Sequence, residues 1–291
     1  MVTQNNGKEV VSWADKVQRL RDTIDKNREK IFSGSSADVD QEQYVGLFFQ
    51  AIAKNPRLMD CTITSLIMGL TDSATLGLPI NSIEGDGYLV PRPRSFKQNG
   101  DWVKVWEAQF QAGYLGKLKL AYESSLVAGI TVEAVRDGDV FKVRLGTTQE
   151  IEHEPKGGSV ITGIYAVMWL TSGCRRCVYW TTEQIQEHAK AFVDSKTLDS
   201  SKSAWTTNWR SMACKTVLLN LLKYAPVSDR ARRVMQSEEY ADAGVEVSRP
   251  TLRSGDTMPP TDLDGLAEPD DSGFAGEPTE EELRAAGLLN A

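Results

Sequence analysis

Cationic and aromatic side chains stand close together at three places in this chain of 291 residues. These places hold Tyr114 with Lys117 and Lys119, Trp205 and Trp209 with Arg210, and Lys223 with Tyr224. Cations contact phosphates and aromatic rings stack on bases of any sequence, so the combination is typical of proteins that bind single-stranded nucleic acid. Two alternatives stay open: the indole rings belong to the core, and a carboxylate of the protein pairs with Arg210 and Lys215.

Residues that could catalyse a reaction are few. The chain has two histidines, His153 and His188. We expect His188 on the surface of an amphipathic helix, and His153 in a structural role rather than in proton transfer. Cys174 and Cys177 are spaced like half of a zinc site, but on a strand their side chains point to opposite faces. The sequence has no glycine-rich motif for ATP phosphates, so we expect no catalytic residue, no metal and no required cofactor.

Four carboxylates leave one enzymatic alternative open. Asp60, Asp72, Glu84 and Asp86 fall within a short stretch, and clustered carboxylates hold the two metal ions of many nucleases. Their spacing matches no nuclease motif. We therefore expect structural or solvent-exposed roles for them, with magnesium as a modulator at most, and keep a metal-dependent nuclease as a rival from a different class.

Charge is divided unevenly along the chain, whose formal net charge is −7. Residues 238–291 hold 14 acidic residues and three arginines, a net charge of −11, and the rest holds 30 basic and 26 acidic residues, a net charge of +4. The low overall pI is therefore no argument against a polyanionic partner. The acidic end is read either as a solvated segment that limits self-association or as a docking segment for a partner protein.

The amino-terminal sequence and the cysteine content bear on the compartment. Residues 1–20 have no apolar run of the length that a secretory signal needs, and no window approaches 18 consecutive apolar residues. Four cysteines in a chain of this length indicate reduced thiols. We expect a cytoplasmic protein with no membrane partner.

Hydrophobic periodicity and turn residues predict an α+β fold. Helices are expected at about 40–54, 62–77, 113–124, 182–193 and 203–224. A short strand is expected at 88–90, closed by Pro91 and Pro93, followed by a second strand at about 103–110. Two hairpins are expected at 129–145, around Asp137-Gly138, and at 160–180, around Ser172-Gly173. The prediction is two β-hairpins or a small antiparallel sheet, packed with helices around a long buried carboxy-terminal helix.

Composition suggests three parts. Residues 1–40 are expected to be a helical and linker segment, and residues 41–237 the folded core. Residues 238–291, rich in Pro, Gly, Ser, Asp and Glu, are expected to be an acidic disordered tail.

Six segments, in order, resemble the RecT family of phage and prophage single-strand annealing proteins. They are Ser73–Pro79, Gly87–Pro91, Phe110–Gly116, Val135–Phe141, His153–Pro155 with Ile164–Val167, and Trp205–Ser228. The resemblance covers roughly residues 58–228. It implies that the core, residues 41–237, binds and anneals DNA and that residues 1–40 make oligomer contacts. Two positions depart from the family pattern: Leu115 and Cys214 stand where the family has cations.

The resemblance implies an ATP-independent protein that coats single-stranded DNA as a ring or filament of identical copies and anneals complementary strands. It implies an annealed duplex intermediate as a second ligand, and a phage 5′→3′ exonuclease and the host single-strand-binding protein as partners. Base pairing supplies the free energy of annealing, so the protein has only to neutralise phosphate repulsion and hold one strand with its pairing edges outward.

The nucleic-acid site is expected to combine a cationic groove with residues that hold bases or sugars. The cations are Lys117, Lys119, Arg136, Lys196, Arg210, Lys215 and Lys223, and the other contacts are Tyr88, Gln109 and Tyr114. Two rivals share these residues: a coat protein that protects single strands without annealing them, and a structural assembly protein whose basic residues form salt bridges between subunits.

Overall fold

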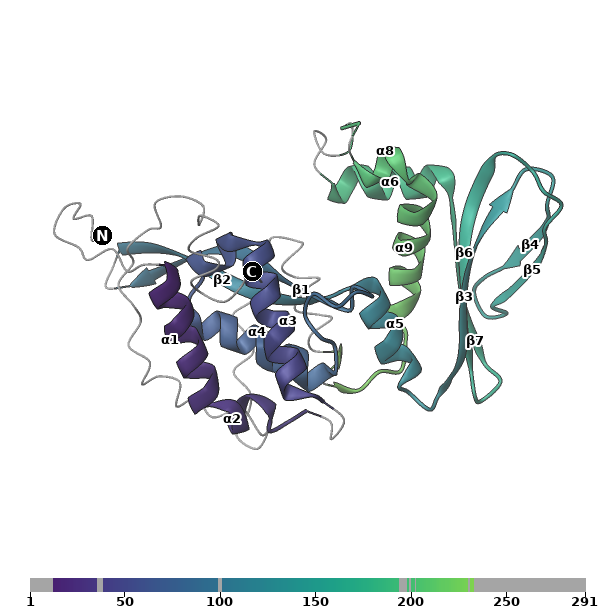
Figure 1. The fold of residues 1–291 in the computed structure, drawn as a ribbon. Coiled ribbons are helices and arrows are strands. Elements are labelled where there is room, and N and C mark those ends of the chain that lie inside the picture. The colour runs from purple at the N-terminus through teal and green to yellow at the C-terminus, as the bar shows by residue number, and fades with distance from the viewer. Residues whose placement is uncertain are drawn as a thin grey trace. The chain divides into compact units, whose positions relative to one another are not determined.

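The computed structural model describes residues 13–35, 39–98, 101–193, 198, 200–201, 203–229 and 231–232. The chain divides into two compact units, one formed by residues 1–116 and 230–291 and the other by residues 117–229. Helices and small antiparallel sheets occur in both (Figure 1), which confirms the α+β prediction. In the described part of the chain, no helix has both the length and the apolarity that a membrane span requires.

The first unit is built on helices that bury one apolar stripe each. They are α1 (Trp13–Lys26), α2 (Arg28–Phe32), α3 (Gln41–Lys54), the 3-10 helix η1 (Pro56–Asp60) and α4 (Ile63–Leu76). The predicted helices at 40–54 and 62–77 are thus confirmed. Asp40 caps α3, because its side chain accepts from the N–H groups of Glu42 and Gln43. Gly77, with a φ of 66°, ends α4 in the left-handed conformation.

A two-stranded antiparallel sheet covers α4. Strand β1 (Gly87–Gln98) pairs with β2 (Asp101–Ala112) without a register shift. Buried Ser65 of α4 fixes this sheet, because its hydroxyl accepts from the Ala108 N–H at 2.9 Å. Leu89 and Phe110, which are paired across the strands, are buried on the same face.

The prediction that Pro91 and Pro93 close the first strand is wrong, because β1 continues through both. The Gly87 carbonyl accepts from the Asn81 N–H and so faces away from β2. Residues at alternate positions, including both prolines, share this orientation. The missing N–H groups therefore fall on the open side of the strand, where no ladder bond is lost.

The second unit combines a three-stranded sheet with a separate hairpin. Its strands are β3 (Val127–Arg136), β4 (Val140–Arg144), β5 (Glu150–Glu154), β6 (Ile161–Leu170) and β7 (Arg175–Thr181), and α5 (Tyr114–Tyr122) contains the boundary between the units. The sheet order is β3-β6-β7, and β4 pairs with β5 alone. The predicted hairpin at 160–180 is confirmed as β6 and β7.

The predicted hairpin at 129–145 is wrong in its pairing. Asp137 and Gly138 do form a turn, but β3 pairs with β6 and β4 pairs with β5, which the sequence did not indicate as a strand. Side chains explain the change of partner. The Asp137 main chain and carboxylate both bond Val160 instead of closing β3 onto β4.

Helices follow the sheet. Thr181 and Gln184 form the predicted capping box of α6 (Thr182–Phe192). The predicted helix at 203–224 is interrupted: α8 (Ala204–Thr207) ends at Asn208, which has a φ of −145°, and α9 (Trp209–Leu222) begins there. Ala213, Val217, Leu218, Leu221 and Leu222 of α9 are buried.

A side chain from outside the three-stranded sheet hydrogen-bonds to the main chain at the open edge of each outer strand, β3 and β7. The Tyr122 hydroxyl accepts from the Ile130 N–H at 3.0 Å and donates to the Ile130 carbonyl at 3.2 Å on β3. On β7, the Cys177 N–H donates to the side-chain oxygen of Gln149 at 2.8 Å. Gln149 holds this place with a φ of 52°, which is unusual for a residue other than glycine.

Candidate nucleic-acid interface

The outer face of the β1–β2 hairpin carries two of the predicted contacts. Tyr88 is 50% exposed, and Gln109 is half-buried on the paired strand. Alternation along each strand places both on the face opposite buried Leu89 and Phe110. A ring and an amide on one solvent-facing surface can stack on a base and hydrogen-bond to it.

Two arginines lie on the same face and were not among the predicted contacts. Arg92 and Arg94 lie four and six residues after Tyr88, and on a strand such even spacing places all three on one face. A predicted strand that continued through the two prolines would have included both arginines. Arg94 donates to Glu107 of β2 at 2.8 Å. The outer face therefore carries an exposed ring and, further along β1, two arginines.

Tyr114 stands at the start of α5, beside this hairpin. It is 39% exposed, and the preceding Gly113 donates its N–H to the Asp86 carbonyl at 2.7 Å. The ring of Tyr88 lies against the same glycine, since its Cε2 would be 3.2 Å from a Cβ at Gly113. The first unit thus presents two exposed tyrosines around one close main-chain contact.

Lys117 and Lys119 both belong to α5. Lys119 is exposed and Lys117 is half-buried. Tyr114 and Lys117 are three residues apart on a helix, so they lie on neighbouring positions of one face. Their contact with DNA stays a prediction.

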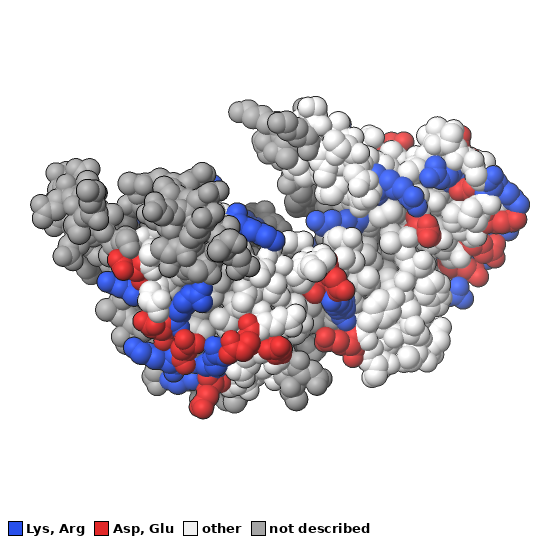
Figure 2. All heavy atoms as spheres, in the orientation of Figure 1, with Lys and Arg blue, Asp and Glu red and all other residues white. Residues whose placement is uncertain are grey.

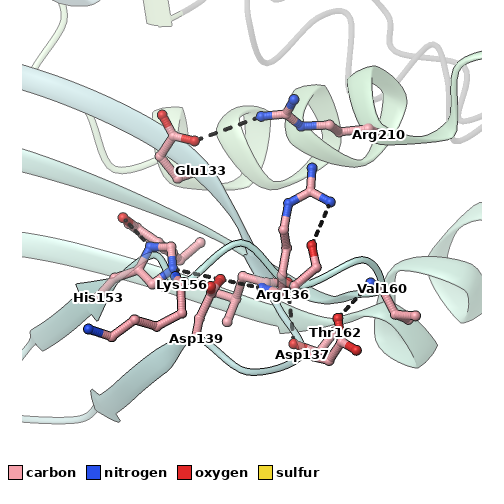
Figure 3. Close-up of polar contacts among 12 residues, drawn as sticks. Glu133, Arg136, Asp137, Asp139, His153, Lys156, Val160, Thr162 and Arg210 are labelled. Carbon is pink, nitrogen blue, oxygen red and sulfur yellow. Dashed lines mark hydrogen bonds and ion pairs between the residues drawn. The ribbon is translucent and has the colours of Figure 1, made fainter.

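Arg136 is the last residue of β3, and the carboxylates of Asp137 and Asp139 hold the loop that follows it (Figure 3). Its guanidinium donates to the Gly158 carbonyl at 3.3 Å, and its N–H donates to Asp139 at 2.7 Å. Asp137 accepts from the Val160 N–H at 2.6 Å. These contacts fix the main chain of Arg136 and leave the side chain half-buried.

His153 lies behind this loop, with its side chain 6% exposed. Its Nε2 is 3.1 Å from Asp139 and its Nδ1 is 3.2 Å from the Tyr165 hydroxyl. The Lys156 N–H, His153 and the Arg136 N–H hold the pKa of the Asp139 carboxyl well below its usual range. With both ring nitrogens engaged inside the protein, this geometry supports the structural role expected for His153.

Arg210, near the start of α9, lies 3.9 Å from the carboxylate of Glu133 on β3 (Figure 3). Both side chains are about half exposed, at 55% and 52%. The contact is an exposed ion pair, a type that contributes only about 0–1 kcal/mol. The carboxylate alternative considered for Arg210 is thus present, in a form that a phosphate could displace.

The remaining predicted cations are on or near α9. Lys215 is half-buried and Lys223, just after the helix, is exposed. Burial and, second, the charge of Lys223 lower the pKa of His188. Helical spacing puts Arg210 and Lys215 on different sides of α9, so they do not share one face. Lys196 and the acidic tail lie outside the described residues.

Comparisons with known proteins show the family to which the sequence is related. A family model described as the RecT family matches residues 42–251. The chain belongs to the RecT family. It is 26% identical to Protein RecT of Escherichia coli (strain K12) over 79% of this chain and 82% of that protein. It is 29% identical to the uncharacterized protein YqaK of Bacillus subtilis (strain 168), over 63% of this chain and 59% of that protein.

The glycines of the RecT-like segments have a packing role. A Cβ at Gly116 would lie 2.1 Å from the Asp86 carbonyl oxygen, and one at Gly113 would lie 2.0 Å from that of Gly85. Only glycine allows α5 to begin this close to the loop before β1. The segments that resemble the RecT family thus build the support for Tyr88 and Tyr114.

The two departures from the RecT pattern, Leu115 and Cys214, lie on different helices and are both half-buried. Leu115 is at the first turn of α5, and Cys214 is on α9. Burial and Glu133 raise the pKa of the Cys214 thiol, against the effect of Arg210. Neither position offers a charge to a phosphate at neutral pH.

The outer face of the β4–β5 hairpin carries charges of both signs. Its cations are paired with carboxylates across the strands: Lys142 with Glu152, Arg144 with Glu150, and Lys156 with Glu154 just beyond. Figure 2 shows basic and acidic side chains interleaved over this end of the second unit. This surface is neutralised within the protein and offers little to a polyanion.

Metal-ligating residues do not converge in the described part of the chain. No group of three His, Cys, Asp or Glu side chains there could hold a metal ion. Cys174 is exposed and Cys177 is buried, where its thiol donates to the Gln149 carbonyl. Asp86 is buried and accepts from the Ser82 hydroxyl at 3.1 Å, which is a structural contact.

Proposed function

We propose that this protein binds single-stranded DNA and anneals it to a complementary strand without ATP, as an assembly of identical copies. Membership of the RecT family, whose proteins act in single-strand annealing and DNA recombination, is the observation that carries the proposal. The exposed rings and cations of the two units support it. The proposed contacts are those predicted from the sequence, with Arg92 and Arg94 added.

The mechanism rests on charge and stacking rather than on bond making. Exposed cations lower the repulsion between two strands, because each phosphate contact releases condensed counterions. Tyr88 and Tyr114, both exposed, would hold bases or sugars of the first strand. Copies bound side by side raise the effective concentration of each contact along the strand.

We further propose that the copies form a ring or filament and that the annealed duplex intermediate is a second ligand. The proposed partners are a 5′→3′ exonuclease and a single-strand-binding protein, the proposed location is the cytoplasm, and no cofactor is required. The acidic composition of residues 238–291 supports a docking or solvating role for that segment.

An annealing assay tests the proposal directly. Two complementary oligonucleotides, one with a fluorophore and one with a quencher, are mixed with protein and without nucleotide, with and without magnesium. Faster quenching than without protein, with strands that stay intact on a gel, is the expected result. Tight binding without acceleration would indicate a coat protein, and shortened strands would indicate a nuclease.

A further inference from the structure

An exposed aromatic ring lies just after α9, next to the predicted contact Lys223, and was not itself assigned a role in the predicted site. Tyr224 is 54% exposed. Its main chain is nonetheless fixed: its N–H donates to the Leu221 carbonyl at 3.0 Å, and the N–H of buried Ala225 donates to the Leu222 carbonyl at 3.0 Å. A ring on such a rigid support loses little conformational entropy when a ligand packs on it.

One face of this ring is occupied by a cation. The guanidinium carbon of Arg176, on β7, lies 4.0 Å from the centroid of the Tyr224 ring. The Nε of Arg176 is buried and makes no hydrogen bond within the described structure, so stacking on the ring is the main contact seen for this group. Because Arg176 covers one face and the ring is half exposed, the opposite face is open to a flat ligand.

A second cation stands next to the ring. Lys223 precedes Tyr224 and is exposed. Its charge reaches His188, whose ring packs edge-on against Trp180 with centroids 5.0 Å apart. The surroundings therefore combine an open aromatic face with two positive charges, a pattern that matches a planar base attached to an anionic backbone.

We propose that Tyr224, backed by Arg176, is a stacking site for a base of single-stranded DNA, with Lys223 beside it for the adjoining phosphate. This inference rests on the proposed function and adds a base-binding residue to it. Stacking needs no particular base, so the site would hold the strand without selecting a sequence.

The test compares Tyr224→Ala with Tyr224→Phe in the full chain. Because Phe keeps the ring, Tyr224→Phe is expected to bind oligonucleotides like the wild type. Tyr224→Ala is expected to weaken binding about 5-fold to 100-fold, the range for one lost base stack. The slope of log K against log salt should not change, since no phosphate contact is lost. Thermal unfolding of both variants controls for folding.

An abasic oligonucleotide of equal length separates stacking from other causes. The wild type should prefer the strand with bases, and Tyr224→Ala should lose much of that preference. Equal preference in both proteins would overturn the stacking site, as would weaker binding by Tyr224→Phe to the level of Tyr224→Ala. A wild-type protein that fails to bind or anneal would instead count against the proposed function itself.

Discussion

Two antiparallel hairpins of this protein carry basic side chains on their outer faces and use them differently. On β4–β5 and just beyond it, each of three cations has a carboxylate partner. On β1–β2, the ion pair of Arg94 with Glu107 shares one face of the hairpin with exposed Tyr88 and half-buried Gln109. The comparison teaches that a count of Lys and Arg does not locate a nucleic-acid surface. Ion pairs occur on both hairpins, and what distinguishes β1–β2 is the exposed ring and the amide on the same face.

The strongest test of this contrast removes the support of the β1–β2 face. Gly116→Ala places a Cβ against the Asp86 carbonyl and is expected to lower the free energy of unfolding by about 1–3 kcal/mol and to weaken DNA binding. Gly46→Ala is the control, because nothing lies within 4 Å of its Cβ. In a helix that change should stabilise by about 0.5–1 kcal/mol. Urea unfolding measures both, and equal stability of the two variants would contradict the packing role of Gly116.

Removing an exposed side chain from each hairpin tests the faces themselves. Tyr88→Ala is expected to weaken single-strand binding about 5-fold to 100-fold through a lost stack. Leu145→Ala removes a side chain of similar exposure, 47%, from the turn after β4 and should leave affinity unchanged. Fluorescence anisotropy with a labelled oligonucleotide gives both values. Comparable losses in the two variants would show that the two faces do not differ.

Acid should loosen the attachment of β4–β5 more than that of β1–β2. The pKa of Asp139 is lowered in the folded protein, so its stabilising contribution is present above the ordinary carboxyl pKa of about 4 and is lost as pH falls below it. Asp139→Asn should therefore be less stable than wild type at pH 7, with a difference that shrinks in acid. Glu152→Gln, on the exposed ladder, is the control. A pH-independent difference would argue against this account.

Salt dependence tests whether a lysine contacts a phosphate. Lys215→Ala is expected to weaken binding and to flatten the slope of log K against log salt by about 0.7, the value for one contact with a single strand. Lys142→Ala removes a cation already paired with Glu152 and should leave the slope as it is. An unchanged slope for Lys215→Ala would remove that residue from the interface.

The smallest expected effect concerns Glu133. Its carboxylate lies 3.9 Å from Arg210 and competes with a phosphate, so Glu133→Gln should tighten binding by about twofold, in line with the small free energy of an exposed pair. Glu152→Gln removes the same charge from the β4–β5 ladder and serves as the control. A like gain in both variants would show only the effect of net charge.

Local signals in the sequence predicted much of the fold. The stripe of α4 with its final glycine and the capping box of α6 depend on residues close in the chain, and both are present. The pairing of β3 with β6 could not be read in this way, because Asp137 bonds Val160, 23 residues further on. The open side of β1, which tolerates two prolines, likewise depends on tertiary structure: within the described residues, that sheet has two strands.

DNA binding by the residues of the candidate site stays a prediction, and their grouping in the structure differs from the one that spacing along the chain indicated. The predicted tyrosines are exposed, but the helical spacing that joined Trp205 to Trp209 is broken at Asn208. Arg210 proved to have a carboxylate neighbour from a distant strand. Such neighbours are set by tertiary packing, which no spacing along the chain reveals.

The hydroxyl of Tyr122 and the amide of Gln149 occupy main-chain groups at the two rims of the three-stranded sheet. Many copies crowded along one DNA strand, as proposed here, would bring such rims close together, and exposed rims tend to fuse into continuous sheets. At Ile130 and Cys177 a neighbouring strand would have to displace these side chains first. One occupied position on each edge thus makes the addition of a further strand less favourable there.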